Sequence, residues 1–86
     1  MAYYNVIWRT SAERELRRLP REAITNMVAL AAALANDPFP RGVTKLAGTE
    51  HTWRLRSGDY RLIYSVAGEA LVVEIVRVGH RKEVYR

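Results

Sequence analysis

The sequence has no cysteine, only two histidines and a single phenylalanine among its 86 residues. Without cysteine there is neither a disulfide framework nor a thiolate metal site, which is compatible with the reducing cytoplasm where we expect the protein to act. No apolar run approaches the roughly 20 residues of a transmembrane helix. The first residues, MAYYNVIWR, lack the basic start and long apolar stretch of a signal peptide. We therefore expect no membrane association.

Acidic residues are also scarce relative to basic ones. Fourteen Lys and Arg stand against nine Asp and Glu, giving a net charge of +5 and a pI near 10.1. Twelve of the 14 cations are arginine, the exceptions being Lys45 and Lys82. The planar guanidinium group suits phosphate and stacks on bases. This charge favours a polyanionic partner, nucleic acid before membrane, whereas solubilising charge with no partner is the alternative.

The chain is short enough to form one domain, residues 1–86, and its apolar fraction of 49% argues for a packed core. Tyr3–Arg9 is rich in aromatic and β-branched residues and predicts a strand. Thr10, with Glu13 three residues later, predicts a capping box at the start of a helix. A second helix is predicted from about Arg21 to Ala35, since apolar residues recur there with a helical period.

After a breaker segment, NDPFPRG, the pattern changes from helical to extended. We predict an α+β fold in which an N-terminal strand and an antiparallel helical hairpin pack on a four-stranded, mainly antiparallel sheet. The N-terminal strand is expected to rejoin the later strands, because alone it could not bury its face. The later strands are Val43–Leu46, Thr52–Arg56, Tyr60–Val66 and Leu71–Val78.

Arginines gather in the hairpin predicted for the second and third of these later strands. Side chains alternate along a strand, so Arg54 and Arg56 project from one face, opposite Trp53, which we assign to the core. Arg61 returns on the neighbouring strand about 5 Å away and lies beside them if the register is right. The sequence thus predicts a cationic surface on the sheet face opposite the helices.

The chain ends on VRVGHRKEVYR, a strand followed directly by charged residues. We expect Gly79 to let the chain turn off its strand, so that His80, Arg81 and Tyr85 fold over the rim of the cationic surface. Lys82 adds a further cation beside them. The sequence therefore predicts one cluster made from the hairpin and the chain end.

Such a cluster could perform chemistry on RNA. Arginines bind phosphate and stabilise the negative charge of a pentacoordinate transition state. Tyrosine stacks on a base or transfers a proton, and histidine suits acid–base work near neutrality. If the ribose 2′-OH is the nucleophile, no metal is needed, and we expect neither a metal nor another cofactor.

Each residue of the cluster also has a purely structural interpretation, which the sequence leaves open. These alternatives are a solvated strand face for Arg54 and Arg56, an ion pair with Asp59 or Glu74 for Arg61, a cap or turn of the chain end for His80, and an aromatic anchor for Tyr85.

Three motifs carry a resemblance to a known family. They are KLAG at Lys45–Gly48, WRLRSGDYRLIYSV at Trp53–Val66 and VRVGHRKEVYR at Val76–Arg86. With them the chain resembles, almost end to end, the RelE/ParE superfamily of toxins from bacterial toxin–antitoxin pairs. RelE-like members are ribosome-dependent endoribonucleases that cut mRNA in the A site, leaving a 2′,3′-cyclic phosphate and a 5′-OH. ParE-like members share the fold and poison DNA gyrase.

The resemblance implies roles for individual residues. Basic residues on the hairpin correspond to Arg54 and Arg61, the arginine after the last strand to Arg81, and the terminal tyrosine to Tyr85. This implies that Arg61 and Arg81 hold the scissile phosphate, with Arg54 in support. Tyr85 and His80 are the candidates for proton transfer, and Arg56 and Lys82 are further phosphate contacts. Thr52 stands where some ribonuclease members carry a lysine, so the identity of the general base stays open.

The resemblance also implies partners. They are a cognate RelB-like antitoxin, mRNA on the 30S A site of the ribosome, and operator DNA only through the antitoxin. The ending GHRKEVYR favours the ribonuclease branch. The alternatives are a gyrase-inhibiting toxin without nuclease activity, and a non-catalytic module that only binds its antitoxin.

Overall fold

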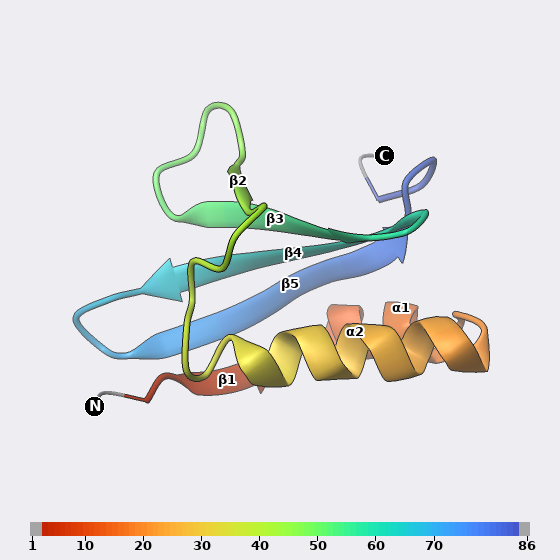
Figure 1. Ribbon diagram of the computed structural model, residues 1–86, viewed down its shortest axis with the longest axis horizontal. Coiled ribbons are helices and arrows are strands. Elements are labelled where there is room, and N and C mark those ends of the chain that lie inside the picture. The colour runs from red at the N-terminus through yellow and green to blue at the C-terminus, as the bar shows by residue number, and fades with distance from the viewer. Residues whose placement is uncertain (1–2, 85–86) are drawn as a thin grey trace.

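The computed structural model describes residues 3–84, which form two helices and five strands (Figure 1). Both helices lie on one side of the sheet in Figure 1, α2 nearer the viewer than α1. Residues 81–84, after the last strand, lie beside the turn between the third and fourth strands. In chain order the elements are β1 (Asn5–Trp8), α1 (Thr10–Arg17), α2 (Arg21–Ala33), β2 (Thr44–Lys45), β3 (Thr52–Ser57), β4 (Tyr60–Ala67) and β5 (Val72–His80).

The sheet is mixed and has the strand order β1-β5-β4-β3-β2. β1 pairs in parallel with β5, and the remaining pairs are antiparallel. The predicted α+β class and the return of the N-terminal strand to the sheet are confirmed. β1 thus adds a fifth strand to the four later ones. Joining the sheet lets Val6 and Trp8 pack against the core.

The predicted capping box at the start of α1 is wrong. The residue before the helix is Arg9, and no side chain caps the first turn. The Arg9 N–H donates to the Ile75 carbonyl of the sheet (3.0 Å), and its own carbonyl accepts the Glu13 N–H (3.0 Å). Because the sheet already holds Arg9, Arg9 takes the N-cap position. Thr10 is then the first residue of the helix, and its hydroxyl is not placed to cap the first turn.

The core lies between the helices and the sheet. α2 contributes Ala23, Met27 and Ala31, which are buried, whereas Val28 is 46% exposed. Trp53 packs partly buried against this core, as predicted. The cluster of buried residues consists of Ala12, Met27, Ala31, Leu34, Leu55, Leu62, Tyr64, Val66, Val73, Ile75 and Val78.

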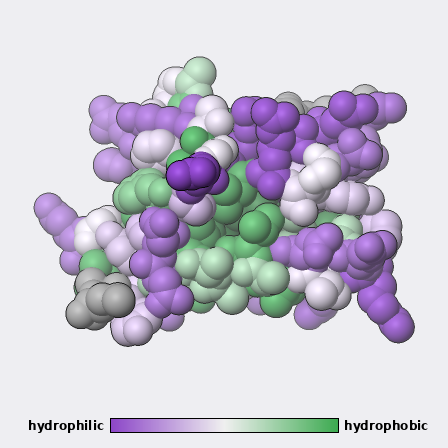
Figure 2. Space-filling view, in the orientation of Figure 1, coloured by the Kyte–Doolittle hydropathy of each residue, from purple (hydrophilic) through white to green (hydrophobic). Residues whose placement is uncertain are grey.

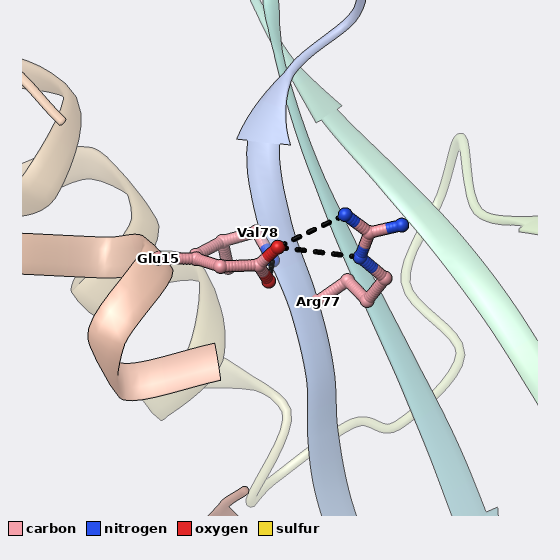
Figure 3. A network of polar contacts seen from close by, with 3 residues as sticks. All are labelled: Glu15, Arg77 and Val78. Carbon is pink, nitrogen blue, oxygen red and sulfur yellow. Dashed lines mark hydrogen bonds and ion pairs between the residues drawn. The ribbon is translucent and has the colours of Figure 1, made fainter. Parts of the chain in front are cut away.

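One carboxylate fastens α1 to the last strand (Figure 3). Glu15 Oε2 accepts hydrogen bonds from Arg77 Nη2 (2.9 Å) and Nε (3.3 Å), and Glu15 Oε1 accepts one from the Val78 N–H (3.2 Å). The Glu15 and Arg77 side chains are only 27% and 33% exposed. Hydrogen bonds to charged groups in such partly buried places are stronger than average. Glu15 therefore fixes the helix against the end of β5 that leads to the chain terminus.

A second anchor holds the loop after α2. The fully buried Tyr64 donates its hydroxyl to the Pro38 carbonyl (2.6 Å). Burial, and to a lesser extent the nearby charge of Asp37, raises the pKa of the Tyr64 phenol far above its usual value. The hydroxyl therefore stays protonated and keeps donating at any physiological pH.

Candidate functional site

The β3–β4 hairpin sets three arginines side by side. Leu55 belongs to the buried core, so by strand alternation Arg54 and Arg56 face away from the helices. The register pairs Arg56 with Arg61 across the two strands. This is the neighbourhood that the sequence predicted.

The segment that follows β5 adds two more cations. Residues 81–84, here called the C-terminal turn, lie next to the β3–β4 turn. The Arg81 N–H donates to the Asp59 carbonyl (2.8 Å), and Arg81 Nε lies 3.7 Å from Asp59 Oδ1. Arg61 is the β4 partner of Gly79, and Arg81 follows two positions after Gly79.

Together these residues form one cationic cleft. The hollow has a volume of about 420 Å³, and the described residues that line it are all basic: Arg54, Arg56, Arg61, Arg81 and Lys82. In Figure 2, hydrophilic side chains gather at the end of the molecule where Figure 1 has the β3–β4 turn and the C-terminal turn. A recess lined by guanidinium and ammonium groups suits a phosphate-rich ligand, because several donors can share one charged backbone.

Arg61 is held by the backbone of its own turn. The Nη1 group of Arg61 donates to the carbonyl oxygens of Gly58 (2.9 Å) and Tyr60 (3.0 Å). The structural alternative was an ion pair with Asp59 or Glu74. Among residues 3–84, Asp59 instead pairs with Arg81 and Glu74 with Arg9 (2.9 Å). Neutral carbonyl partners leave the positive charge of Arg61 uncompensated, which suits anion binding.

The prediction that the chain leaves the sheet at Gly79 is wrong. β5 continues through it to His80, and its φ is not among the positive values found at other glycines of the chain. Val84, 2% exposed, packs against Gly79, where an added Cβ would lie 3.8 Å from that of Val84. The reversal begins two residues later than expected, in the C-terminal turn.

His80 does not line the cationic cleft, although it adjoins Arg81 in sequence. It lines a second hollow, of about 490 Å³, whose other lining residues include Glu15, Tyr60, Arg77 and Glu83. The His80 ring stands edge-on to Tyr60, with centroids 5.6 Å apart and the planes at 84°. Its Nδ1 accepts a hydrogen bond from the Lys82 N–H (3.1 Å). The structure thus separates His80 from the arginines with which the sequence had grouped it.

The sequence prediction also named Tyr85 and Asp59. Tyr85 lies outside the described residues, so its predicted role stays a prediction. The sequence had offered Asp59 only as an ion-pair partner for Arg61. Its contacts with Arg81 depend on where the C-terminal turn meets the hairpin, which no local pattern predicts.

The part of the chain that the structure describes offers neither a group of metal ligands nor a membrane-spanning helix. Between residues 3 and 84, no three or more His, Cys, Asp or Glu side chains are grouped to hold a metal ion. Neither described helix is long and apolar enough to cross a membrane.

Comparison with known proteins adds a family. Residues 6–85 match the family model described as the ParE toxin of the type II toxin–antitoxin system, parDE. Among curated proteins, toxin RelG of Mycobacterium tuberculosis is 34% identical over 84 residues, covering 96% of this chain and 97% of the relative. Toxin RelE of the same organism is 31% identical, covering 96% and 87%.

Solved structures agree with these sequence matches. The toxin–antitoxin complex RelBE2 from Mycobacterium tuberculosis contains a chain with a TM-score of 0.82 and 34% identity, covering 96% of this chain and 97% of that one. A chain of the archaeal RelE–RelB complex from Pyrococcus horikoshii OT3 has a TM-score of 0.82 and 31% identity, covering 95% and 99%. The likeness therefore extends over the whole described fold.

Proposed function

We propose that this chain, which belongs to the RelE/ParE superfamily of type II toxins, cleaves mRNA in the A site of the ribosome and so inhibits translation. The observation that carries this proposal is the cationic cleft, in which five basic residues from β3, β4 and the C-terminal turn meet. Arginines held this close together repel one another, and an RNA backbone would relieve that repulsion.

In the proposed reaction the ribose 2′-OH attacks the adjacent phosphorus. The bond from phosphorus to the 5′ oxygen breaks, leaving a 2′,3′-cyclic phosphate and a 5′-OH. A base accepts the proton of the 2′-OH, and an acid protonates the departing 5′ oxygen. Arg61 and Arg81 hold the scissile phosphate and stabilise the charge that develops on its oxygens. Arg54, Arg56 and Lys82 contact the phosphate backbone around it.

Proton transfer is proposed for Tyr85, in keeping with the family resemblance. Arg81 is a second candidate for the acid, although a guanidinium group gives up its proton reluctantly. The ribosome would supply much of the rate by holding the mRNA in line for attack, a proximity effect.

We also infer a cognate antitoxin of the RelB type. Several of the similar toxins were solved in complexes with their antitoxins. A basic surface on a small domain suits an acidic or amphipathic helical segment. Operator DNA would be bound only through the antitoxin, and the toxin would act in the cytoplasm.

A second candidate function is inhibition of DNA gyrase without cleavage of nucleic acid. It is favoured by the family model, which is described as a ParE toxin. The cationic cleft favours the ribonuclease, since a gyrase poison needs no clustered phosphate ligands.

The deciding experiment maps mRNA 5′ ends in a reconstituted translation reaction with and without the purified chain. Cuts at A-site codons that require ribosomes are the expected result. A parallel assay measures DNA supercoiling by gyrase. Intact mRNA together with accumulating gyrase–DNA breaks would overturn the ribonuclease and support the second candidate.

A further inference from the structure

All four backbone N–H groups of the C-terminal turn are bound, three of them by His80. The N–H groups of Glu83 and Val84 donate to the His80 carbonyl (2.8 and 3.0 Å), and that of Lys82 donates to His80 Nδ1 (3.1 Å). The fourth, from Arg81, donates to the Asp59 carbonyl (2.8 Å). His80 therefore determines the path of the backbone that carries two of the five cations of the cleft.

The contact at Nδ1 reproduces a familiar turn. In an Asx turn, a side-chain oxygen of Asn or Asp accepts the N–H two residues later. His80 Nδ1 occupies the place of that oxygen with respect to Lys82. A neutral imidazole that accepts at Nδ1 carries its proton on Nε2, so neither nitrogen is free to accept a proton from a substrate.

The rest of the ring is engaged away from the cleft. It packs edge-on against Tyr60, which is its partner in the β4–β5 register. The hollow that His80 lines has Glu15 and Glu83 as well as Arg18 and Arg77 in its wall, so it lacks the uniform positive charge of the cationic cleft. Acid–base work at the cleft would require His80 to leave both the Lys82 N–H and Tyr60.

We propose that His80 is a positioning residue: its Nδ1 holds the Lys82 N–H and so keeps Arg81 and Lys82 in the cationic cleft. The activity readout of this inference rests on the proposed ribonuclease function, whereas its structural readout does not. Position 80 therefore requires a side chain that accepts a hydrogen bond, not one that acts as an acid or base.

The test compares two amides that differ by one methylene group. His80→Asn presents an oxygen where Nδ1 stands and completes a true Asx turn, whereas His80→Gln carries its oxygen one bond farther out. His80→Phe keeps a ring against Tyr60 and has no acceptor. His51→Gln and His51→Phe are the matched controls, because the His51 side chain is exposed in the loop before β3. Only its main-chain carbonyl, which both variants keep, accepts a backbone N–H among the described residues, that of Val66 (2.9 Å).

Two measurements are made on each variant, after circular dichroism has shown that it is folded. The first is the rate of mRNA cleavage on the ribosome. We expect His80→Asn to stay within about threefold of the wild type, and His80→Gln and His80→Phe to fall about 10- to 100-fold, as displaced catalytic groups do. The second is hydrogen exchange at the Lys82 amide, measured by NMR. It should be unchanged in His80→Asn and about five- to tenfold faster in the other two, the effect of one lost hydrogen bond.

Other outcomes overturn the inference. If His80→Asn loses as much activity as His80→Gln while its Lys82 amide stays protected, His80 transfers a proton itself. If His80→Phe cleaves like the wild type, the acceptor is dispensable. If the wild type cuts no mRNA, the proposed function is wrong, but hydrogen exchange at the Lys82 amide still tests whether His80 positions the turn. Equal Lys82 exchange in the wild type and His80→Phe would then overturn the positioning role by itself.

Discussion

Arg56 and Arg61 occupy directly paired positions on β3 and β4. Side chains at such positions lie about 5 Å apart at their Cβ atoms, and like charges placed there destabilise a sheet. The hairpin would be more stable with a neutral residue at either position. A pairing that costs stability and yet lines the cationic cleft is typical of a binding site rather than of a structural surface.

Replacing Arg56 with a β-branched neutral residue should therefore stabilise the fold. We expect Arg56→Thr to raise the free energy of unfolding by about 0.5 kcal/mol, since it removes the repulsion and introduces a good strand former. Urea denaturation measures this change. The same variant should bind single-stranded RNA more weakly, with a slope of log affinity against log salt smaller by about 0.7, the share of one phosphate contact.

Arg54→Thr is the matched control for the stability effect, because the β4 partner of Arg54 is Ile63 and carries no charge. An equal gain in stability from both substitutions would show that strand propensity, not the pairing of Arg56 with Arg61, is responsible.

Removal of Arg81 should abolish most of the cleavage. In Arg81→Ala the rate on the ribosome should fall at least ~100-fold, the scale of losing one preorganised donor to a developing charge. Primer extension on the translated mRNA measures the rate. Arg41→Ala, an exposed arginine in the loop before β2 that does not line the cleft, should leave it unchanged. A loss below about threefold in Arg81→Ala would place that side chain outside the reaction.

Loss of the Glu15 carboxylate should weaken the packing of α1 on β5. Glu15→Ala removes the ion pair with Arg77 and the acceptor for the Val78 N–H, so we expect a loss of about 1–3 kcal/mol in the free energy of unfolding. Denaturation in urea checks this. Glu15→Gln, which retains one acceptor oxygen, should lose less, and the exposed neighbour Arg14→Ala should change little. Equal losses from the two Glu15 variants would mean that only the charge matters.

The buried phenol of Tyr64 should make stability fall at alkaline pH. Its pKa is raised in the folded state, so the unfolded chain loses the proton first, at the ordinary value of 10.0. The stability that the protonated Tyr64 phenol contributes is complete below pH 10 and is lost as the pH rises beyond that value. Between pH 9 and pH 11 the wild type should lose about 1 kcal/mol more than Tyr64→Phe. Below that range Tyr64→Phe should be less stable by about 1–2 kcal/mol, because the Pro38 carbonyl loses its donor. Parallel pH dependences would contradict the raised pKa.

The strands of the hairpin show how far local pattern reaches. Alternation in TWRLRS predicted that Arg54 and Arg56 share a face, and the short turn that follows implied that Arg61 returns beside them. Both follow from rules that act within a few residues, the two-residue period of a strand and the closure of a tight hairpin. The cap of α1 was mispredicted for the opposite reason: the Thr10 pattern is local, but Arg9 is held by Ile75, far away in the sequence.

The side-chain directions of His80 and Arg81 could not be predicted from a local pattern. His80 and Arg81 are neighbours in sequence, yet one packs on Tyr60 and the other lines the cationic cleft. No pattern in GHRKEV distinguishes them, because the direction of each side chain depends on how the turn is bound by Asp59 and by the backbone of β5.

The amino-acid sequence by itself determined the α+β class, the hairpin with its arginine face, and the excess of positive charge, since these depend on composition and on periods of two and 3.6 residues. Only the tertiary structure decided that β1 lies in parallel beside β5, that Asp59 holds Arg81 at the predicted cluster, and that His80 does not line it. Those outcomes depend on hydrogen bonds and packing between segments distant in the chain, whose free energies no local pattern encodes.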